Sequence, residues 1–413
     1  MPRGLRAAVA CVLGVLALAG GTTGCGGDDE RSAVKKGPDT LTLYSSLPLQ
    51  GADRARSRDM VDAIKLALEE SGGKIGPLSI TYVSLDSAKP GARTWSADKV
   101  LENARQAVRD LNTIAYIGDR DSAATALSVP LTNEGDILQV SPSSTYDGLT
   151  RESRRQGEPE RFYPSGQRTF ARVVPADHVQ AAALVGYMKV VGARSVALLA
   201  DREIYGGGIA DAVEKAAVRQ GITVYDRGHV DALKEDLSGP ARKVAETGAD
   251  AFLFAGTTDT GAAAIFRAVA AAGPDMQLFG PAAVADQGFA RALPAAVQRR
   301  IHVTTPALPP RLLPAPARAF RNRFRATFGH PPAPEALQAY EAASAVLHAI
   351  RAAGEKGNDR RAVTEAFFAI RDRESVLGRY SIDRFGDTSL SRYAGNRVSG
   401  SRFVLDKLLE VRR

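Results

Sequence analysis

The stretch NTIAYIGDRDSAATALSVPLTNEGDILQVSPSST, residues 112–145, decides the fold that the sequence predicts. An apolar run at 113–117 ends at Gly118, a helical segment opens at 121–124, and a second apolar run at 137–140 leads into SPSST. This order predicts strand, helix, strand, with hydroxyl side chains at the C-terminal end of each strand. In open α/β sheets, ligands bind outside these strand ends, where loops and helix N-termini present unpaired N–H groups.

The two hydroxyl clusters predict a ligand site at this edge of the sheet. Ser122 can hold a carboxylate or another oxygen-rich group with its side chain and the first-turn N–H groups behind it, and Ser143 and Thr145 can complete the same cup. The alternative for each cluster is local, because Ser122 or Asp121 can cap the helix and SPSST can be an ordinary turn. Two clusters on successive strand ends favour a site.

The length and composition indicate a globular protein with two domains. The chain has 413 residues, of which 44% are hydrophobic and 24% charged, and it is too long for one core of ordinary size. The net charge is +8, but no dense basic run with interleaved aromatic residues occurs, so we expect no nucleic-acid partner.

The N-terminus predicts export and a lipid anchor. Basic residues precede the apolar run 7–19, and small residues lead to Cys25, so residues 1–24 are typical of a secretory signal peptide. Cys25 resembles the acylated cysteine of bacterial lipoproteins, although Thr22 stands where that pattern prefers Leu. An ordinary secretion signal with an unrelated cysteine is the alternative. We expect residues 25–38 to form a polar tether to the membrane.

From Thr40 onward, apolar runs alternate with amphipathic helical patterns, which predicts an α/β fold of two doubly wound parallel-sheet lobes. Charge and turn residues at 146–168 predict a long surface loop that ends one lobe. Three successive helical patterns after a proline-rich connection cannot extend a sheet, so the chain is expected to return to the first lobe through a multi-crossing hinge. The expected division is lobe 1 at 39–168, lobe 2 at 169–304, lobe 1 again at 305–377, and closing strands of lobe 2 or the hinge at 378–413.

Several motifs in this order resemble the type I periplasmic-binding-protein family that serves branched-chain amino acid ABC importers. They are the SAAT and SPSST clusters, DREIYGGGIADAVEKAA at 201–217, PEALQAYEAASAVLHAIRAAG at 334–354 and GRYSIDRFGD at 378–387. The resemblance covers the chain from about Thr40 to the C-terminus, and it lies in the order and spacing of the motifs.

The resemblance implies roles for particular residues. Ser122, Ser143 and Thr145 match the positions that hold the ligand carboxylate, and Tyr205 matches a tyrosine that faces the cleft from the second lobe. The alternative for Tyr205 is an aromatic residue that covers a helix start. Thr257 and Thr258 stand where an aromatic pair usually contacts the ligand, and their alternative role is a helix N-cap.

One departure concerns the ligand's ammonium group. Relatives that bind α-amino acids place an acidic residue just after a Gly-Pro turn, whereas this chain has Ala282 there. A buried ammonium without a carboxylate is costly, so either Asp286 or Asp259 takes the role, or the ligand is a carboxylate, an amide or another small polar metabolite.

The expected function is that of an extracytoplasmic solute-binding lipoprotein, anchored to the cell membrane through Cys25, that delivers an amino acid-like or carboxylate ligand to an ABC permease. The alternatives are a ligand sensor that reports to a membrane receptor or kinase, and a degenerate binding fold. We expect no enzyme and neither a metal nor a cofactor, because the sequence has no phosphate loop, no H-E-x-x-H pair and no G-x-S-x-G turn.

Overall fold

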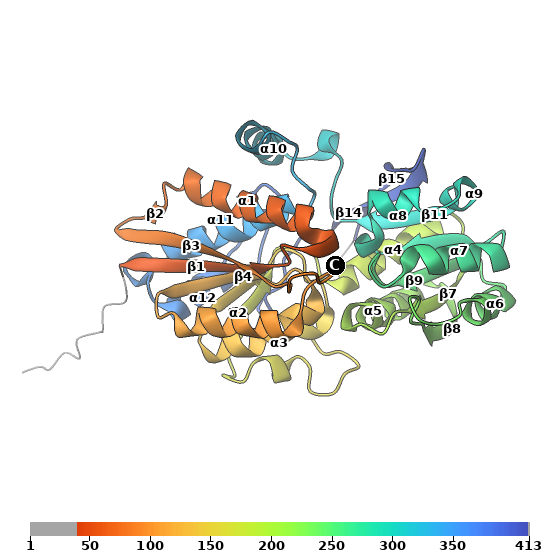
Figure 1. Cartoon of the computed structure of the whole chain (residues 1–413), viewed down its shortest axis with the longest axis horizontal. Coiled ribbons are helices and arrows are strands. Elements are labelled where there is room, and N and C mark those ends of the chain that lie inside the picture. Colours follow the sequence, from red (N-terminus) through yellow and green to blue (C-terminus); the bar gives the residue numbers. More distant parts are fainter. Residues whose placement is uncertain (1–38, 412–413) are drawn as a thin grey trace, which may run out of the picture. The chain divides into compact units, whose positions relative to one another are not determined.

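Two sheets organise residues 39–411, the part of the chain that this computed structural model describes (Figure 1). The first sheet has the strand order β2-β3-β1-β4-β5-β6 and the second the order β15-β14-β11-β10-β9-β7-β8. Helices cover both sheets, which confirms the predicted α/β class with two doubly wound lobes. The predicted signal peptide at 1–24, Cys25 and the tether at 25–38 lie outside the described residues.

The first sheet is parallel except at its β2 edge, where β2 pairs antiparallel with β3. Its central strand has the sequence TLTLYSSL, and every residue after the first is buried, as expected for a strand covered on both faces. The strands are β1 (Thr40–Leu47), β2 (Lys74–Ile75), β3 (Leu78–Asp86), β4 (Thr113–Gly118), β5 (Leu138–Ser141) and β6 (Phe170–Arg172).

Helices from two distant parts of the chain cover this sheet. Ile64 of α1 and Phe320 and Val346 of the late helices share one buried apolar cluster with Leu43 of β1. The chain therefore comes back to the first sheet after it has built the second. The helices of this lobe are α1 (Arg54–Glu70), α2 (Ala97–Arg109), α3 (Ser122–Glu134), α10 (Ala315–Phe328), α11 (Ala336–Ala352) and α12 (Arg360–Phe368).

In the second sheet, successive side chains of a strand point to opposite faces, and helices cover both faces. Leu198 packs in the apolar cluster under α4 and α5, while its neighbours Ala197 and Leu199 pack in the cluster under α6 and α7. The helices are α4 (Asp177–Val190), α5 (Ile204–Gln220), α6 (Ser238–Glu246), α7 (Ala262–Ala272), α8 (Gln287–Arg291) and α9 (Ala295–Gln298). The strands are β7 (Ser195–Ala200), β8 (Thr223–His229), β9 (Ala251–Ala255), β10 (Gln277–Gly280), β11 (Ile301–Thr305), β14 (Arg392–Ser399) and β15 (Arg402–Glu410).

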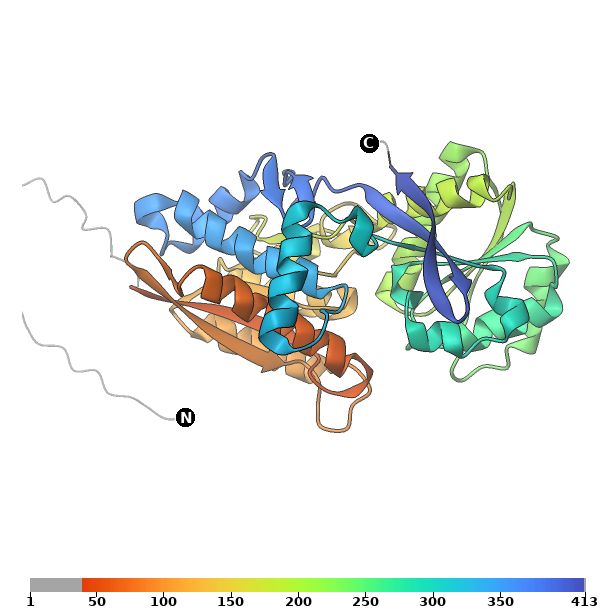
Figure 2. The same cartoon turned by 90° about the horizontal axis from the view of Figure 1, so that it is seen from above.

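Three segments connect the sheets, at 173–176, 306–314 and 383–391. Before the last of them, a small hairpin of β12 (Arg373–Ser375) and β13 (Gly378–Tyr380) packs with the first lobe, because Tyr380 and Ile382 belong to its core cluster. Figure 2 shows the chain then continuing into β14 and β15, which complete the second sheet. Three connections between two lobes are the multi-crossing hinge that the sequence predicts.

The structure differs from the sequence prediction at three places. The expected boundary at 168/169 assigns Phe170–Arg172 to the second lobe, whereas β6 pairs with β5 in the first sheet. The prediction was wrong because the sequence of a three-residue strand is too short to indicate which strand it pairs with. The stretch at 146–168 is not a plain surface loop, since Tyr146, Leu149 and Phe162 are buried in one apolar cluster. The closing strands expected at 378–413 divide between the lobes, because β13 packs with the first lobe while β14 and β15 complete the second sheet.

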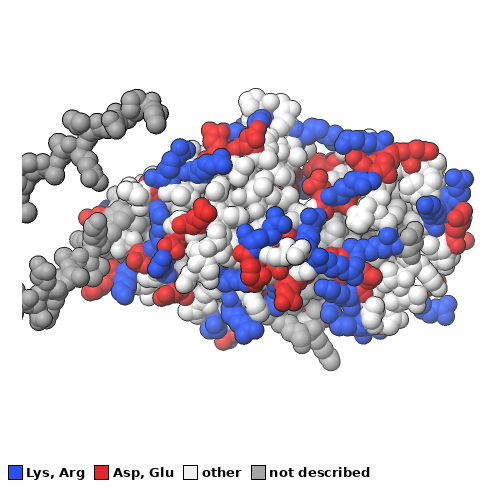
Figure 3. All heavy atoms as spheres, turned by 90° about the horizontal axis from the view of Figure 1, so that it is seen from below, with Lys and Arg blue, Asp and Glu red and all other residues white. Residues whose placement is uncertain are grey.

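The surface charge is mixed. Over the face drawn in Figure 3, Lys and Arg alternate with Asp and Glu. Within the described part of the chain, no helix is long and apolar enough to cross a membrane. No cluster of three or more His, Cys, Asp or Glu side chains suited to a metal ion occurs there either.

Candidate functional site

A cavity of about 510 Å³ brings together residues of both lobes. Ser122, Ser143 and Thr145 line it from the first lobe, and Tyr205 and Thr257 from the second. These residues follow the C-terminal ends of strands, which is the edge of the sheet where α/β proteins bind ligands. A larger hollow of about 810 Å³ lies elsewhere, along α4 and β15, and its lining includes none of these five residues.

Ser122 is the first residue of α3 and is nearly buried. Its Oγ accepts a hydrogen bond from the backbone N–H of Tyr146 at 3.3 Å, so its own proton remains free to donate to a ligand oxygen. The first-turn N–H groups of Ser122 and Ala123, which also line the cavity, have no partner in the helix. The N-cap residue is Asp121, but its side chain makes no capping hydrogen bond. The helix start therefore offers donors to an anionic group.

The SPSST cluster is partly used to hold its own loop. Ser143 Oγ donates to the carbonyl of Arg120 at 2.8 Å, and Ser141 Oγ donates to the carbonyl of Asp119 at 2.8 Å. Ser143 consequently has only lone pairs to offer a ligand. The carbonyl of Thr145 accepts the N–H of Asp177 at 2.9 Å, which ties this cluster to the first turn of α4 in the other lobe.

The second lobe contributes a tyrosine and a threonine turn. Tyr205, the second residue of α5, is half-buried in the cavity wall. Thr257 donates its backbone N–H to Thr260 Oγ1 at 2.9 Å, and Thr260 Oγ1 donates to Asp201 at 2.7 Å. Thr258 does not line the cavity. The N-cap of α7 is Gly261, so the structure does not support the alternative that Thr257 or Thr258 caps this helix.

Asp286 lies outside the lining of the cavity. Its side chain caps α8, because Oδ1 accepts the N–H groups of Gly288 at 2.6 Å and Phe289 at 3.2 Å, and it also pairs with Arg56. Ala282 does line the cavity. The carboxylate of Asp286 is therefore held away from the wall that Ala282 forms.

Several charged residues of the lining were not predicted from the sequence. Arg120 pairs with Asp53 at 3.0 Å and with Asp121 at 3.5 Å. Burial raises the pKa of Asp121 to about 6, with Arg120 opposing the rise and Asp53 adding to it. Glu335 and Gln338, at the start of α11, line the same cavity although they lie two hundred residues further along the chain. Only the return of α11 to the first lobe reveals them.

Comparisons with known proteins agree with this architecture. A family model described as "Periplasmic binding protein" matches residues 45–389. A "Leu/Ile/Val-binding protein homolog 3" from Brucella melitensis is 25% identical over 222 residues, which are 52% of this chain and 54% of the relative, so the chain spans about half the length of this curated relative. An "Amino acid binding protein" from Pseudomonas aeruginosa is 23% identical over 324 residues, 78% of this chain and 80% of the relative.

A solved structure of a leucine binding protein, LivK, from Thermotoga maritima is similar in fold. It superimposes with a TM-score of 0.75 at 22% identity and covers 90% of this chain and 99% of its own. At that identity the similarity establishes the architecture, and the ligand has to be argued from the cavity.

Proposed function

Because the chain belongs to the periplasmic binding protein family, we propose that it is an extracytoplasmic solute-binding lipoprotein that captures a small polar ligand between its lobes and delivers it to an ABC-type importer. The observation that carries this proposal is the cavity itself, which is lined from both lobes by strand ends and helix starts. Similarity to amino acid-binding relatives supports an amino acid or a related metabolite as the ligand.

Binding in this proposal involves no chemical step. An oxygen-rich end of the ligand accepts hydrogen bonds from the Ser122 hydroxyl and the first-turn N–H groups of α3, with Thr145 beside them. Tyr205 and Thr257 of the second lobe then close over the other end. Closure about three connecting segments removes water from the cavity, which strengthens the hydrogen bonds to the ligand.

A thermal-shift screen tests the proposal. The soluble form from Asp28 onward is heated with amino acids, amides and small carboxylates, each in excess. A ligand present at about a hundred times its dissociation constant stabilises the folded state by about 2.7 kcal/mol and visibly raises the midpoint. If no compound raises it, the proposal of a small polar ligand is contradicted.

Substitution of the hydroxyl residues tests the site. Replacing Ser122 and Thr145 together with Ala is expected to weaken binding of the ligand found in the screen by about 2–4 kcal/mol, because charge-assisted hydrogen bonds are lost. Thr81→Ala, an exposed threonine on β3 outside the cavity, is the control and leaves affinity unchanged. Unchanged affinity in the double variant would place the ligand elsewhere.

The membrane anchor in this proposal is the lipid on Cys25, which the sequence alone supports. The full-length protein is expected to sediment with membranes, whereas Cys25→Ala is released as a soluble protein. Membrane association that survives this substitution would contradict the lipid anchor.

A further inference from the structure

We propose that the cavity selects a ligand with a positively charged group, an amine or a guanidinium, and that this group lies among Asp121, Asp259 and Glu335. This inference rests on the proposed function and names the class of its ligand. It follows from the charges that line the cavity and from buried acceptor atoms that have no partner.

The lining contains more carboxylates than cations. Its cations are Arg120, Arg202 and Lys234, and its carboxylates are Asp121, Asp201, Glu203, Asp231, Asp259 and Glu335. Every cation is already paired, since Arg202 contacts Glu235 at 2.8 Å, Lys234 contacts Asp231 at 3.1 Å, and Arg120 contacts two carboxylates. Among residues 39–411, Asp259 and Glu203 have no ion pair, whereas Glu335 contacts Arg56 at 3.6 Å through one of its two oxygens. The cavity lining therefore has an excess of negative charge.

Two carboxylates contact the guanidinium of Arg120, Asp53 at 3.0 Å and Asp121 at 3.5 Å. Burial lowers the pKa of Arg120, yet Asp121, Asp53, Glu335 and Asp259 together raise it above its ordinary value. The pKa of Asp259 is itself raised, by burial first and then by Asp53, while Arg120, Arg93 and Arg56 oppose the rise. Asp53 of the first lobe and Asp259 of the second therefore repel each other. A cation between them removes that repulsion.

The starts of two helices oppose part of this negative charge. Asp121 is the N-cap of α3 and Glu335 the N-cap of α11, and neither side chain makes a capping hydrogen bond. A helix N-terminus carries roughly half a positive charge, so the two together offset only part of the excess.

Unsatisfied acceptors in the same wall point to a ligand that donates hydrogen bonds. Asp121 Oδ2, Glu335 Oε2 and Gln338 Oε1 are buried and have no hydrogen-bond partner within the described residues. Gln338 is only 8% exposed and lines the cavity, so its unpartnered amide oxygen is available to a ligand. An ammonium group brings three donors and a guanidinium five, which suits a wall of acceptors.

The same wall also has one unsatisfied donor. Arg120 Nε is buried without a partner in the described part of the chain. A ligand oxygen near Arg120 and Ser122 and one ammonium among the carboxylates would suit any α-amino acid. The excess of carboxylates over cations in the lining favours a second cationic group, as in a basic amino acid.

Calorimetric titration of the full chain with a matched pair of ligands tests the inference. L-Lysine and L-norleucine share the amino acid group and an alkyl stem, but only lysine ends in an ammonium. We expect lysine to bind at least 30-fold more tightly than norleucine or leucine. Equal or tighter binding of leucine overturns the cationic preference and leaves the proposed function standing, whereas binding of no solute at all overturns both.

Variants locate the charged group. Asp259→Asn is expected to weaken lysine binding at least tenfold and to weaken norleucine binding less, because norleucine has no terminal ammonium. Asp275→Asn removes an exposed carboxylate of the same lobe outside the cavity and serves as the control. Lysine binding that is unchanged in Asp259→Asn, or lowered equally in the control, overturns the assignment.

Discussion

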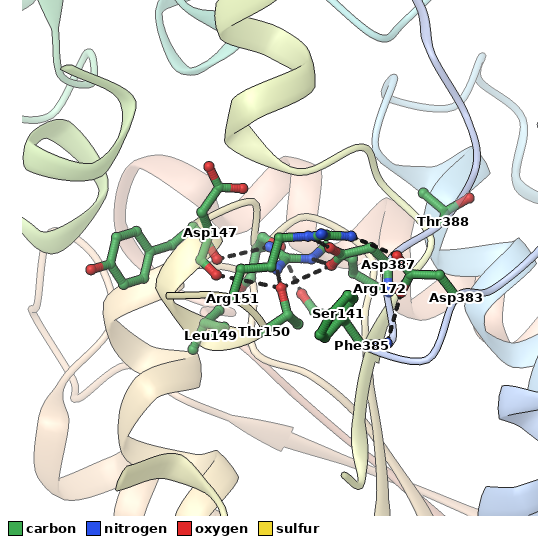
Figure 4. Close-up of polar contacts among 12 residues, drawn as sticks. Ser141, Asp147, Leu149, Thr150, Arg151, Arg172, Asp383, Phe385, Asp387 and Thr388 are labelled. Atoms are coloured by element: carbon green, nitrogen blue, oxygen red, sulfur yellow. Dashed lines mark hydrogen bonds and ion pairs between the residues drawn. The ribbon is translucent and has the colours of Figure 1, made fainter. Parts of the chain in front are cut away.

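The substitution Asp387→Asn tests how the hinge region is held together. Asp387 is 3% exposed and accepts hydrogen bonds from Arg172 Nε at 2.9 Å, Thr150 Oγ1 at 3.0 Å and Arg151 Nε at 2.6 Å. Figure 4 shows these side chains pointing toward one another, from the end of β6, the loop after β5 and the third connecting segment. Asp387 therefore ties a connecting segment to the first lobe.

The expected loss follows from the burial of Arg172. Its side chain is fully buried, so removing the charge of Asp387 leaves a guanidinium without a counter-ion. Breaking a buried ion pair in this way costs about 3–5 kcal/mol. Dividing this loss of unfolding free energy by the unfolding entropy expected for the roughly 370 described residues gives a decrease of about 4–6 °C in the thermal midpoint.

The control is Asp383→Asn. Asp383 also contacts Arg151, at 2.6 Å, but its side chain is 32% exposed, so we expect a loss of less than about 1 kcal/mol. Differential scanning calorimetry of the two variants at pH 7 gives both midpoints. A decrease for Asp387→Asn no larger than that of Asp383→Asn would refute the reasoning about the buried pair.

The pH dependence gives a second view of the same pair. Burial alone would raise the pKa of Asp387, but Arg172 and Arg151 lower it below its ordinary value. A group whose pKa is lowered by folding contributes stability above its unfolded pKa, near 4, and loses it as the pH falls through the folded pKa. The difference between wild type and Asp387→Asn is therefore full at pH 7 and shrinks below about pH 4.

Two further predictions concern stability. A Cβ on Gly206 would lie 2.4 Å from the carbonyl oxygen of Ala255, so Gly206→Ala should lower the free energy of unfolding by about 1–3 kcal/mol. A Cβ on Gly207 would meet nothing within 4 Å, so Gly207→Ala should raise that free energy by about 0.5–1 kcal/mol. Urea unfolding measures both. Equal effects would contradict the packing of α5. Burial and the nearby Asp147 raise the pKa of Asp177 to about 8, so the folded state keeps a proton that the unfolded state has lost above about pH 4. The free energy of unfolding therefore falls between about pH 4 and pH 8, by at most about 1.4 kcal/mol per pH unit. Asp177→Asn should remove this slope, and Asp275→Asn should keep it; a slope that persists in Asp177→Asn would assign it to another group.

The helices and strands of the two sheets could be predicted because their apolar residues repeat with regular periods. The helix at Arg54–Glu70 shows this most directly, since Val61, Ile64 and Leu68 recur at helical spacing and two glycines follow its C-terminal end. Strand β6 has only three residues, and its pairing with β5 depends on tertiary contacts that no local pattern records. Tyr146 and Phe162 are buried for the same reason, inside a stretch whose charges suggest a surface loop.

The candidate site could be predicted only in part. Ser122 and Thr145 follow strand ends, and strand ends of a parallel sheet meet at one edge, so their position in the cavity follows from the topology. Glu335 and Gln338 reach the cavity because a helix far along the sequence returns to the first lobe. The side chain of Asp286 caps α8 and does not line the cavity. The spacing of residues in the sequence does not show which of these positions a side chain takes.

The fluorescence of Trp95 tests most directly the claim that a solute occupies the cavity between the lobes. The sequence contains one tryptophan, and it lines the cavity. Titration with whichever of L-lysine or L-leucine raises the thermal midpoint should change the emission of Trp95 saturably and protect it from acrylamide quenching. A ligand that stabilises the protein while both signals of Trp95 stay constant would contradict the claim.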